Sequence, residues 1–259
     1  MSSPTRLYFD RTFQMLGKRI SDKLLPVVLM KGAEPTLKPR TMFSFNTPDD
    51  IKTFATGCDA DIGGLSTTNF DLDTRPEINR PLGKEATGRF YGRMSLGVKP
   101  GMEGKIRSGY AGFRNKRRPT MFGDVVEDAS GYDYLALRLR AGGDPQTHSS
   151  YFVNIQTEGA SKDLWQHRLY FGKQDGSWED VYIPFTNFVR TSEGAMSQFQ
   201  LTLAKEYIRS VGISLLTGNS SVEGEYELGI DSIRLVNEED MAQDLDGALA
   251  EKKLDEKSS

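Results

Sequence analysis

Three closely spaced segments in the middle of the chain alternate apolar and polar residues. They are residues 151–157 (YFVNIQT), 165–171 (WQHRLYF) and 178–183 (WEDVYI). A period of two buries one side of each segment and turns the other toward water or a partner. Pro184 follows the third segment, and because proline cannot donate a hydrogen bond to a neighbouring strand, we expect that strand to end there. The pattern predicts an antiparallel β-structure.

Similar segments recur between residues 42 and 236, separated by glycine-rich turns. In one of them, Leu135, Leu137 and Leu139 alternate with Arg138 and Arg140. Many short alternating segments indicate an all-β antiparallel sandwich of the jelly-roll type, with peripheral N- and C-terminal helices. We expect strands near residues 65–71, 88–98, 105–113, 133–140, 151–157, 165–171, 178–184, 210–217 and 225–236.

The two terminal regions, residues 1–41 and 237–259, differ from the sandwich domain at 42–236. Apolar residues spaced three or four apart between Phe9 and Leu24 predict an amphipathic helix, followed by a linker. Its basic bias is compatible with a matrix-targeting or membrane-surface helix and equally with an ordinary helix docked on the sandwich. The acidic region 237–259 predicts a weak helix that fades into a disordered tail.

Bulk composition narrows the classes of function. The chain of 259 residues has a formal net charge of -3, which argues against a nucleic-acid partner held by overall charge. Cys58 is the single cysteine, so no intrachain disulfide forms, and we expect a reducing compartment such as the cytosol or the mitochondrial matrix. The sequence shows neither a secretory signal nor a long apolar run, so we expect no membrane span.

Residue types that carry catalysis are sparse and scattered. His148 and His167 lie in different segments, and neither has a second histidine or a cysteine at metal-ligand spacing. The alternation around His167 predicts a packed imidazole. Cys58 precedes Asp59, whose charge would raise the pKa of the thiol. The sequence lacks a phosphate loop, a dinucleotide fingerprint and a nucleophile elbow. We therefore expect no catalytic, cofactor-binding or metal-binding residues, and no enzyme activity.

Asp59 and Asp61 stand beside the glycine pair at 63–64. One interpretation is a calcium site built from carboxylate and carbonyl oxygens. The other is a turn shaped by the acids and glycines.

A basic cluster lies in the long insert 99–120 and consists of Arg114, Lys116, Arg117 and Arg118. It is a candidate contact with a partner or an anionic membrane, because basic residues near such a surface each add attraction. The alternative is a solvated loop.

Aromatic side chains on a sheet face can stack on sugar rings. Tyr170, Trp178 and Tyr182 are the candidates for such a ligand face. The alternative is that the large rings cover the core, since they contribute much buried area.

Several sequence blocks, in a fixed order, make the chain resemble the complex I intermediate-associated protein 30 family. The blocks include DADIGGLS at 59–66, GRFYGRMS at 88–95, GYDYLALRLR at 131–140, WEDVYIPF at 178–185 and ELGIDSIRL at 227–235. The resemblance implies a galactose-binding-like jelly roll related to carbohydrate-binding modules.

The resemblance also implies a function. Such a protein would be a non-enzymatic, chaperone-like assembly factor for mitochondrial respiratory complex I (NADH:ubiquinone oxidoreductase), without a cofactor. It would lie in the matrix, peripheral to the inner membrane, with membrane-arm subunits and other assembly factors as partners. The alternative function is that of a carbohydrate-binding module. The loops at 141–149 and 99–120 are longer than in simpler modules, and either would close an ancestral sugar site if it lay over the concave face.

Overall fold

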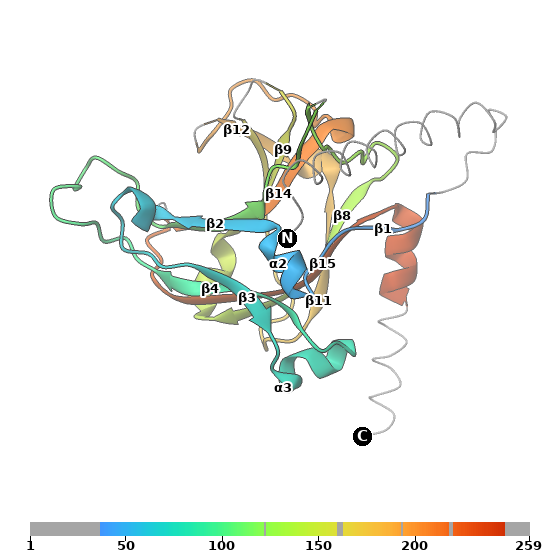
Figure 1. Ribbon diagram of the computed structural model, residues 1–259, viewed down its shortest axis with the longest axis horizontal. Helices are drawn as coiled ribbons and strands as arrows, with labels where there is room; N and C mark the ends of the chain where they lie inside the picture. The colour runs from blue at the N-terminus through green and yellow to red at the C-terminus, as the bar shows by residue number, and fades with distance from the viewer. Residues whose placement is uncertain (1–36, 122, 160–162, 193, 218–219, 247–259) are drawn as a thin grey trace.

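Two antiparallel sheets packed face to face form the described part of the protein. The computed structural model describes residues 37–121, 123–159, 163–192, 194–217 and 220–246 (Figure 1). The amphipathic helix predicted between Phe9 and Leu24 lies outside these residues, as does the tail from 247 to 259.

The first sheet has seven strands in the order β13-β12-β10-β9-β14-β5-β2. Every neighbouring pair in it is antiparallel. Its strands are β2 (Phe54–Cys58), β5 (Tyr110–Asn115), β9 (Tyr151–Thr157), β10 (Leu164–Arg168), β12 (Val189–Ser192), β13 (Ala195–Met196) and β14 (Ile208–Leu216).

The second sheet has six strands in the order β11-β8-β15-β4-β3, with β1 also paired to β15. Its strands are β1 (Arg40–Ser44), β3 (Asn69–Asp73), β4 (Thr87–Met94), β8 (Tyr134–Gly143), β11 (Glu179–Pro184) and β15 (Gly224–Val236). A separate small hairpin pairs β6 (Pro119–Thr120) with β7 (Gly123–Asp124). The predicted all-β antiparallel sandwich is confirmed.

The core lies between the sheets, where the apolar positions of the alternating segments meet. Leu135, Leu137 and Leu139 of β8 are fully buried, as are Val153 and Ile155 of β9. Each buried leucine of β8 is followed by a residue whose side chain points to the opposite face, as the period of two requires. A set of aromatic rings fills one end of the core and consists of Phe45, Phe54, Phe70, Phe90 and Phe113.

The helices are short and lie at connections. They are α2 (Pro48–Lys52), α3 (Pro76–Asn79) and the 3-10 turns η1 (Asp59–Ile62), η2 (Arg80–Leu82), η3 (Pro145–Ser150), η4 (Phe185–Asn187) and η5 (Lys205–Tyr207). Thr47 caps α2 in a reciprocal capping box with Asp50. Residues 238–246 form a helix, drawn in red beside β1 in Figure 1. Asp244 of that helix accepts a hydrogen bond from the Tyr182 hydroxyl at 2.8 Å.

Some strand boundaries differ from the sequence prediction. Strand β5 begins at Tyr110 rather than at 105, because residues 99–109 make turns whose glycines at 101, 104 and 109 have positive φ. Strand β2 follows α2 directly and was not predicted, since its sequence, FATGC, has too few large apolar residues to show a period. Strands β12 and β13 are too short, at four and two residues, to show a period.

Candidate functional site

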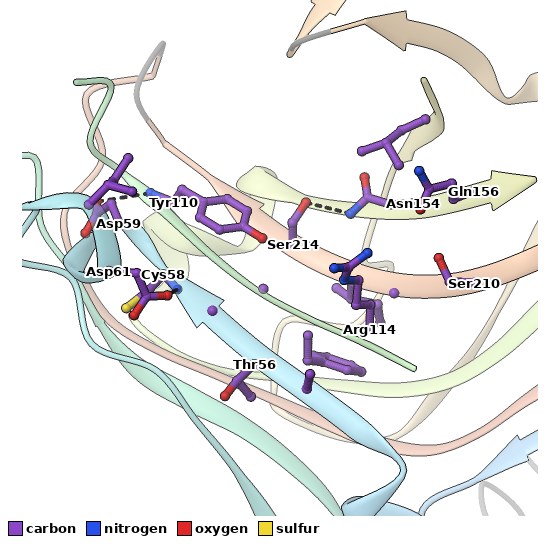
Figure 2. Close-up of a pocket in the computed structure, with 18 of the residues that line it drawn as sticks. Thr56, Cys58, Asp59, Asp61, Tyr110, Arg114, Asn154, Gln156, Ser210 and Ser214 are labelled. Carbon is purple, nitrogen blue, oxygen red and sulfur yellow. Dashed lines mark hydrogen bonds between the residues drawn. The ribbon is translucent and has the colours of Figure 1, made fainter. Parts of the chain in front are cut away.

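A groove runs across the outer face of the seven-stranded sheet, on the side away from the core. The cavity has a volume of about 560 Å³ and is lined by residues of β2, β5, β14, β9 and β10, together with Arg107 from the loop before β5. Figure 2 shows its polar side chains rising from neighbouring strands. A second hollow, beside Phe185 and Lys205, has a volume of about 290 Å³.

Glycines on three adjacent strands deepen the groove, because they place no side chain on its floor. Gly57 of β2 pairs directly with Gly112 of β5, and Gly212 lies on the next strand, β14. A Cβ atom on Gly212 would stand 2.3 Å from the backbone oxygen of Phe113, so the close approach of β14 to β5 requires glycine there. The strands that carry the polar side chains are therefore held close around a floor with few side chains.

A chain of side-chain hydrogen bonds crosses the centre of the groove. The Gln166 amide of β10 donates to Asn154 Oδ1 of β9 at 2.6 Å, and the Asn154 amide donates to Ser214 Oγ of β14 at 2.8 Å. Gln156 and Ser210 extend the polar surface along the next row of the sheet. These amides and hydroxyls both donate and accept, so the groove suits a ligand rich in amides or hydroxyls.

Arg114 and Arg107 are two exposed cations that line the groove, and Arg114 is the one that extends from a strand. Its side chain leaves β5 on the outer face and reaches into the groove below Asn154 (Figure 2). No hydrogen bond or ion pair to its guanidinium occurs within the described residues. An arginine in this state offers several donors to a carboxylate or another acceptor.

The other members of the predicted basic cluster are placed differently. Arg117 forms an ion pair with Asp124 at 2.7 Å, and Arg118 forms one with Glu127 at 3.0 Å. The Lys116 ammonium donates to a backbone carbonyl at 2.8 Å. The structure thus separates Arg114, in the groove, from cations that already have partners. A contact of the whole cluster with a membrane stays a prediction.

Asp59 anchors one end of the groove. Its carboxylate is buried and accepts four hydrogen bonds, from the backbone amides of Ser66, Gly109 and Tyr110 and from the Ser66 hydroxyl. The carboxylate therefore ties the turn at 59–66 to the start of β5.

The neighbouring carboxylate also has a structural role. Asp61 accepts a hydrogen bond from the Cys58 amide at 3.2 Å. Within the described residues, no group of three potential metal ligands occurs. Of the two interpretations of Asp59 and Asp61, the geometry agrees with a turn shaped by the acids and glycines, because both carboxylates accept hydrogen bonds from backbone amides.

Burial shifts the pKa values of Cys58 and His167. Burial raises the pKa of the Cys58 thiol, and the charges of Asp61 and Asp59 act in the same direction, so the thiolate is disfavoured at neutral pH. Burial lowers the pKa of His167, whose ring packs against Phe188. The predicted packed imidazole is confirmed.

The three aromatic residues predicted to share a ligand face do not lie together. Trp178 is only 8% exposed, and its indole nitrogen donates to the Ile78 carbonyl at 2.8 Å. Tyr182, on the six-stranded sheet, is bonded to the C-terminal helix, while Tyr170 is 69% exposed in the connection after β10. A single face for all three is wrong, because the chain crosses from one sheet to the other between β10 and β11, which separates Tyr170 from Trp178 and Tyr182.

An ion-pair cluster occupies the outer face of the six-stranded sheet. Glu227 of β15 accepts hydrogen bonds from Arg75 at 2.8 Å and from Arg89 at 2.7 Å, and it also pairs with Arg140. Burial by itself would raise the pKa of Glu227, but the hydrogen bonds from Arg140 and Arg75 outweigh burial and lower the pKa to about 2. The three arginines of this cluster are therefore paired with a carboxylate, whereas the Arg114 guanidinium in the groove has no such partner within the described residues.

Comparison with known proteins decides the family. Residues 43–230 match the family described as "Complex I intermediate-associated protein 30 (CIA30)". A Neurospora crassa protein named "Complex I intermediate-associated protein 30, mitochondrial" is 32% identical over 99% of this chain and 94% of its own length. The chain belongs to the complex I intermediate-associated protein 30 family. A mouse protein of the same name is 27% identical over 75% of this chain, which spans 55% of the mouse protein.

Solved structures confirm the galactose-binding-like jelly roll of this family member. A family 11 carbohydrate-binding module from Clostridium thermocellum, solved in complex with a β-1,3-1,4-mixed-linked tetrasaccharide, has a TM-score of 0.51. It is 12% identical and covers 78% of this chain and 98% of its own. A second structure of a family 11 module from that organism has a TM-score of 0.50, with 13% identity and coverage of 78% and 96%. At such identities the likeness concerns the fold alone.

Sequence reasoning found Arg114 but missed the amides beside it. Asn154 and Gln156 occupy polar positions of the 151–157 segment, and Gln166 occupies a polar position of the next segment. The alternation of apolar and polar residues in both segments already indicates that these amides lie on the outer face of a sheet. The missing information was the cross-strand register, which brings Gln166, Asn154, Gly212 and Arg114 into one row.

Proposed function

We propose that this chain is a non-enzymatic assembly factor that binds intermediates of mitochondrial respiratory complex I and leaves before the enzyme is complete. The observation that carries the proposal is the match to the Neurospora relative over nearly the whole of both chains. The names of that relative and of the mouse relative refer to complex I intermediates and to the mitochondrion. We place this chain in the matrix, peripheral to the inner membrane, with membrane-arm subunits and other assembly factors as partners.

Binding without chemistry agrees with the groove. Its buried carboxylate, Asp59, is committed to four hydrogen bonds, and the thiol of Cys58 has a raised pKa. The Asp61 carboxylate accepts a hydrogen bond from the Cys58 amide, and most of the other polar groups are amides, hydroxyls and the guanidinium groups of Arg107 and Arg114, which recognise ligands. Within the described residues, no helix is long and apolar enough to cross a membrane.

The test is affinity purification of the tagged chain from mitochondria solubilised in mild detergent, in cells that make complex I. We expect recovery of membrane-arm subunits in particles smaller than the complete enzyme, and absence of the chain from the complete enzyme. Protease protection of the same mitochondria places the chain in the matrix or elsewhere. Recovery of no complex I subunit and no other assembly factor would overturn the proposal.

The groove favours a second candidate, a carbohydrate-binding function. It lies on a sheet face and is rich in hydroxyls and amides. Residues 141–149 are not among those that line it, whereas Arg107 of the 99–120 insert is. The solved family 11 module that shares the fold was captured with a tetrasaccharide. Calorimetry with β-glucan oligosaccharides tests this candidate. Binding that is lost in Asn154→Ala would support it, and no detectable binding would reject it.

A further inference from the structure

The register of the seven-stranded sheet joins the groove to an apolar edge. Side chains of directly paired residues lie on the same face of a sheet. One row therefore runs from Arg114 through Gly212, Asn154 and Gln166 to Val189 on β12. The next row runs along the same face and contains Ser210, Gln156, Leu164, Thr191 and Met196. The polar centre and the β12–β13 edge thus form one continuous surface.

The chemistry of this surface changes along the rows. Its centre holds the unpaired guanidinium of Arg114 and the amide chain of Asn154 and Gln166. Its edge holds aliphatic side chains, with Val189 37% exposed and Met196 73% exposed. The surface therefore offers a charged contact, a band of amide hydrogen bonds and an apolar contact in succession.

The backbone at this edge is already occupied. The Gln200 side chain accepts from the Arg190 amide at 2.8 Å and donates to the Arg190 carbonyl at 3.0 Å. The Ser197 amide also donates to that carbonyl, at 3.0 Å. An incoming strand would have to displace these bonds, so a ligand is better accommodated across the sheet face than as an added edge strand.

The aromatic rings of the open face, Tyr110 and Phe152, lie close to neighbouring groups. The Tyr110 ring lies over the glycine floor, with its hydroxyl 3.0 Å from the place a Cβ on Gly112 would take. The Phe152 ring is covered by the Arg168 guanidinium, 5.3 Å from its centroid. The apolar contact comes from Leu164, Val189 and Met196, which pack well against amino-acid side chains but give no flat platform. These observations favour a polypeptide over a glycan.

We propose that this surface binds an extended segment of a partner protein, with a carboxylate on Arg114 and an apolar side chain at the Val189–Met196 edge. The four steps from β5 to β12 span about 19 Å at the usual strand spacing. An extended chain covers that distance in about six residues. The bound segment thus carries an acidic residue and an apolar residue about six positions apart. The inference deepens the proposed function, on which it rests.

The test uses an array of overlapping peptides of about 15 residues, long enough to cross the surface, that covers the membrane-arm subunits of complex I. The tagged full chain is the probe, and fluorescence anisotropy gives dissociation constants for the peptides that bind. We expect binding peptides to share the acidic and apolar spacing. Arg114→Glu should weaken them by about tenfold or more, because it places like charges together. Changing the acidic residue of a peptide to lysine should restore its binding to that variant.

Lys116→Glu is the matched control, since Lys116 is also exposed and lies just beyond the same strand. It makes the same change of charge and should alter the dissociation constants less than about twofold. Met196→Ser should weaken binding, whereas Met121→Ser, which also removes an exposed methionine, should not. Circular dichroism melts confirm that each variant folds, and Arg114→Gln is used if Arg114→Glu does not.

Unchanged peptide affinity in Arg114→Glu would overturn the inference, as would direct binding of β-glucan oligosaccharides together with no binding of any peptide. Purification from mitochondria separates this failure from failure of the proposed function. If Arg114→Glu still recovers complex I subunits, the groove is not the contact but the assembly role stands. If the unaltered chain recovers none, the proposed function itself is wrong.

Discussion

At the scale of single residues, the charge of Glu227 contributes to stability through its three arginine partners. Its folded-state pKa of about 2 lies below the ordinary value of 4.5. The contribution is therefore complete above about pH 4.5 and is lost as the pH falls toward 2. We expect Glu227→Gln to lower the free energy of unfolding at pH 7 by about 3 kcal/mol, and to flatten its dependence on pH between 4.5 and 2. Urea unfolding at a series of pH values measures both effects.

Glu225 provides the matched control two positions along the same strand. It faces Arg93 at 3.7 Å, and both side chains are largely exposed. An exposed pair of this kind contributes less than about 1 kcal/mol. Glu225→Gln should therefore leave the unfolding curve and its pH dependence nearly unchanged. Equal losses in the two variants would show that the arginines around Glu227 do not depend on its charge.

The floor of the groove depends on single glycines. We expect Gly212→Ala to destabilise the protein by about 1–3 kcal/mol, because the new Cβ would stand 2.3 Å from a backbone oxygen of β5. Gly57→Ala should be tolerated, since its Cβ would meet only Asp61 Oδ2 at 3.5 Å. Thermal unfolding of both variants makes the comparison. A fully stable Gly212→Ala would mean that β14 and β5 can separate at no cost.

At the scale of elements, Asp59 holds the turn at 59–66 against the start of β5. In Asp59→Asn the amide group would face several donors with only one acceptor oxygen, leaving buried N–H groups unpaired. We expect a loss of roughly 3 kcal/mol and faster hydrogen exchange at the amides of Ser66 and Gly109. Asp61→Asn keeps an oxygen for its single bond to the Cys58 amide and should change exchange at those two amides little.

The sequence predicts those strands whose pattern of apolar and polar residues lies within one short segment. The alternation in 151–157 and 133–140 requires only neighbours in sequence, and β9 and β8 appear where it predicts. The end of β11 at Pro184 follows from the missing N–H of proline. Strand β2 has no comparable signal, because an edge strand with a glycine and a threonine gains its order from pairing with β5.

The candidate site needed information that no local pattern contains. Arg114 stood out by charge, but its separation from Arg117 and Arg118 depends on where Asp124 and Glu127 fold back. Trp178 shares a face with Tyr182, as the alternation indicates, but the local pattern does not reveal that its indole lies over Gly229 and donates to the Ile78 carbonyl, 100 residues away in sequence. Sheet membership and cross-strand register fix which outward residues are neighbours, and both arise from long-range pairing.

At the scale of the whole molecule, the two sheets share one core. The apolar cluster includes Leu137 and Ile233 of the six-stranded sheet together with Val153 and Ile213 of the seven-stranded sheet. Neither sheet can expose its inner face without exposing that of the other. Separation would therefore cost both sheets their burial, which favours cooperative unfolding.

The two tryptophans allow this cooperativity to be measured, because each reports on one sheet. Trp165 lies in β10 of the seven-stranded sheet, and Trp178 precedes β11 of the six-stranded sheet. In Trp165→Phe the remaining fluorescence follows the six-stranded sheet, and in Trp178→Phe it follows the seven-stranded sheet. We expect the urea transition by fluorescence to coincide with that by far-ultraviolet circular dichroism within each variant, since a single core gives a single transition. Comparison inside one variant removes the effect of the substitution on overall stability. A fluorescence midpoint that precedes the dichroism midpoint in only one variant would show that its reporter sheet unfolds first and that the sandwich consists of two separable layers.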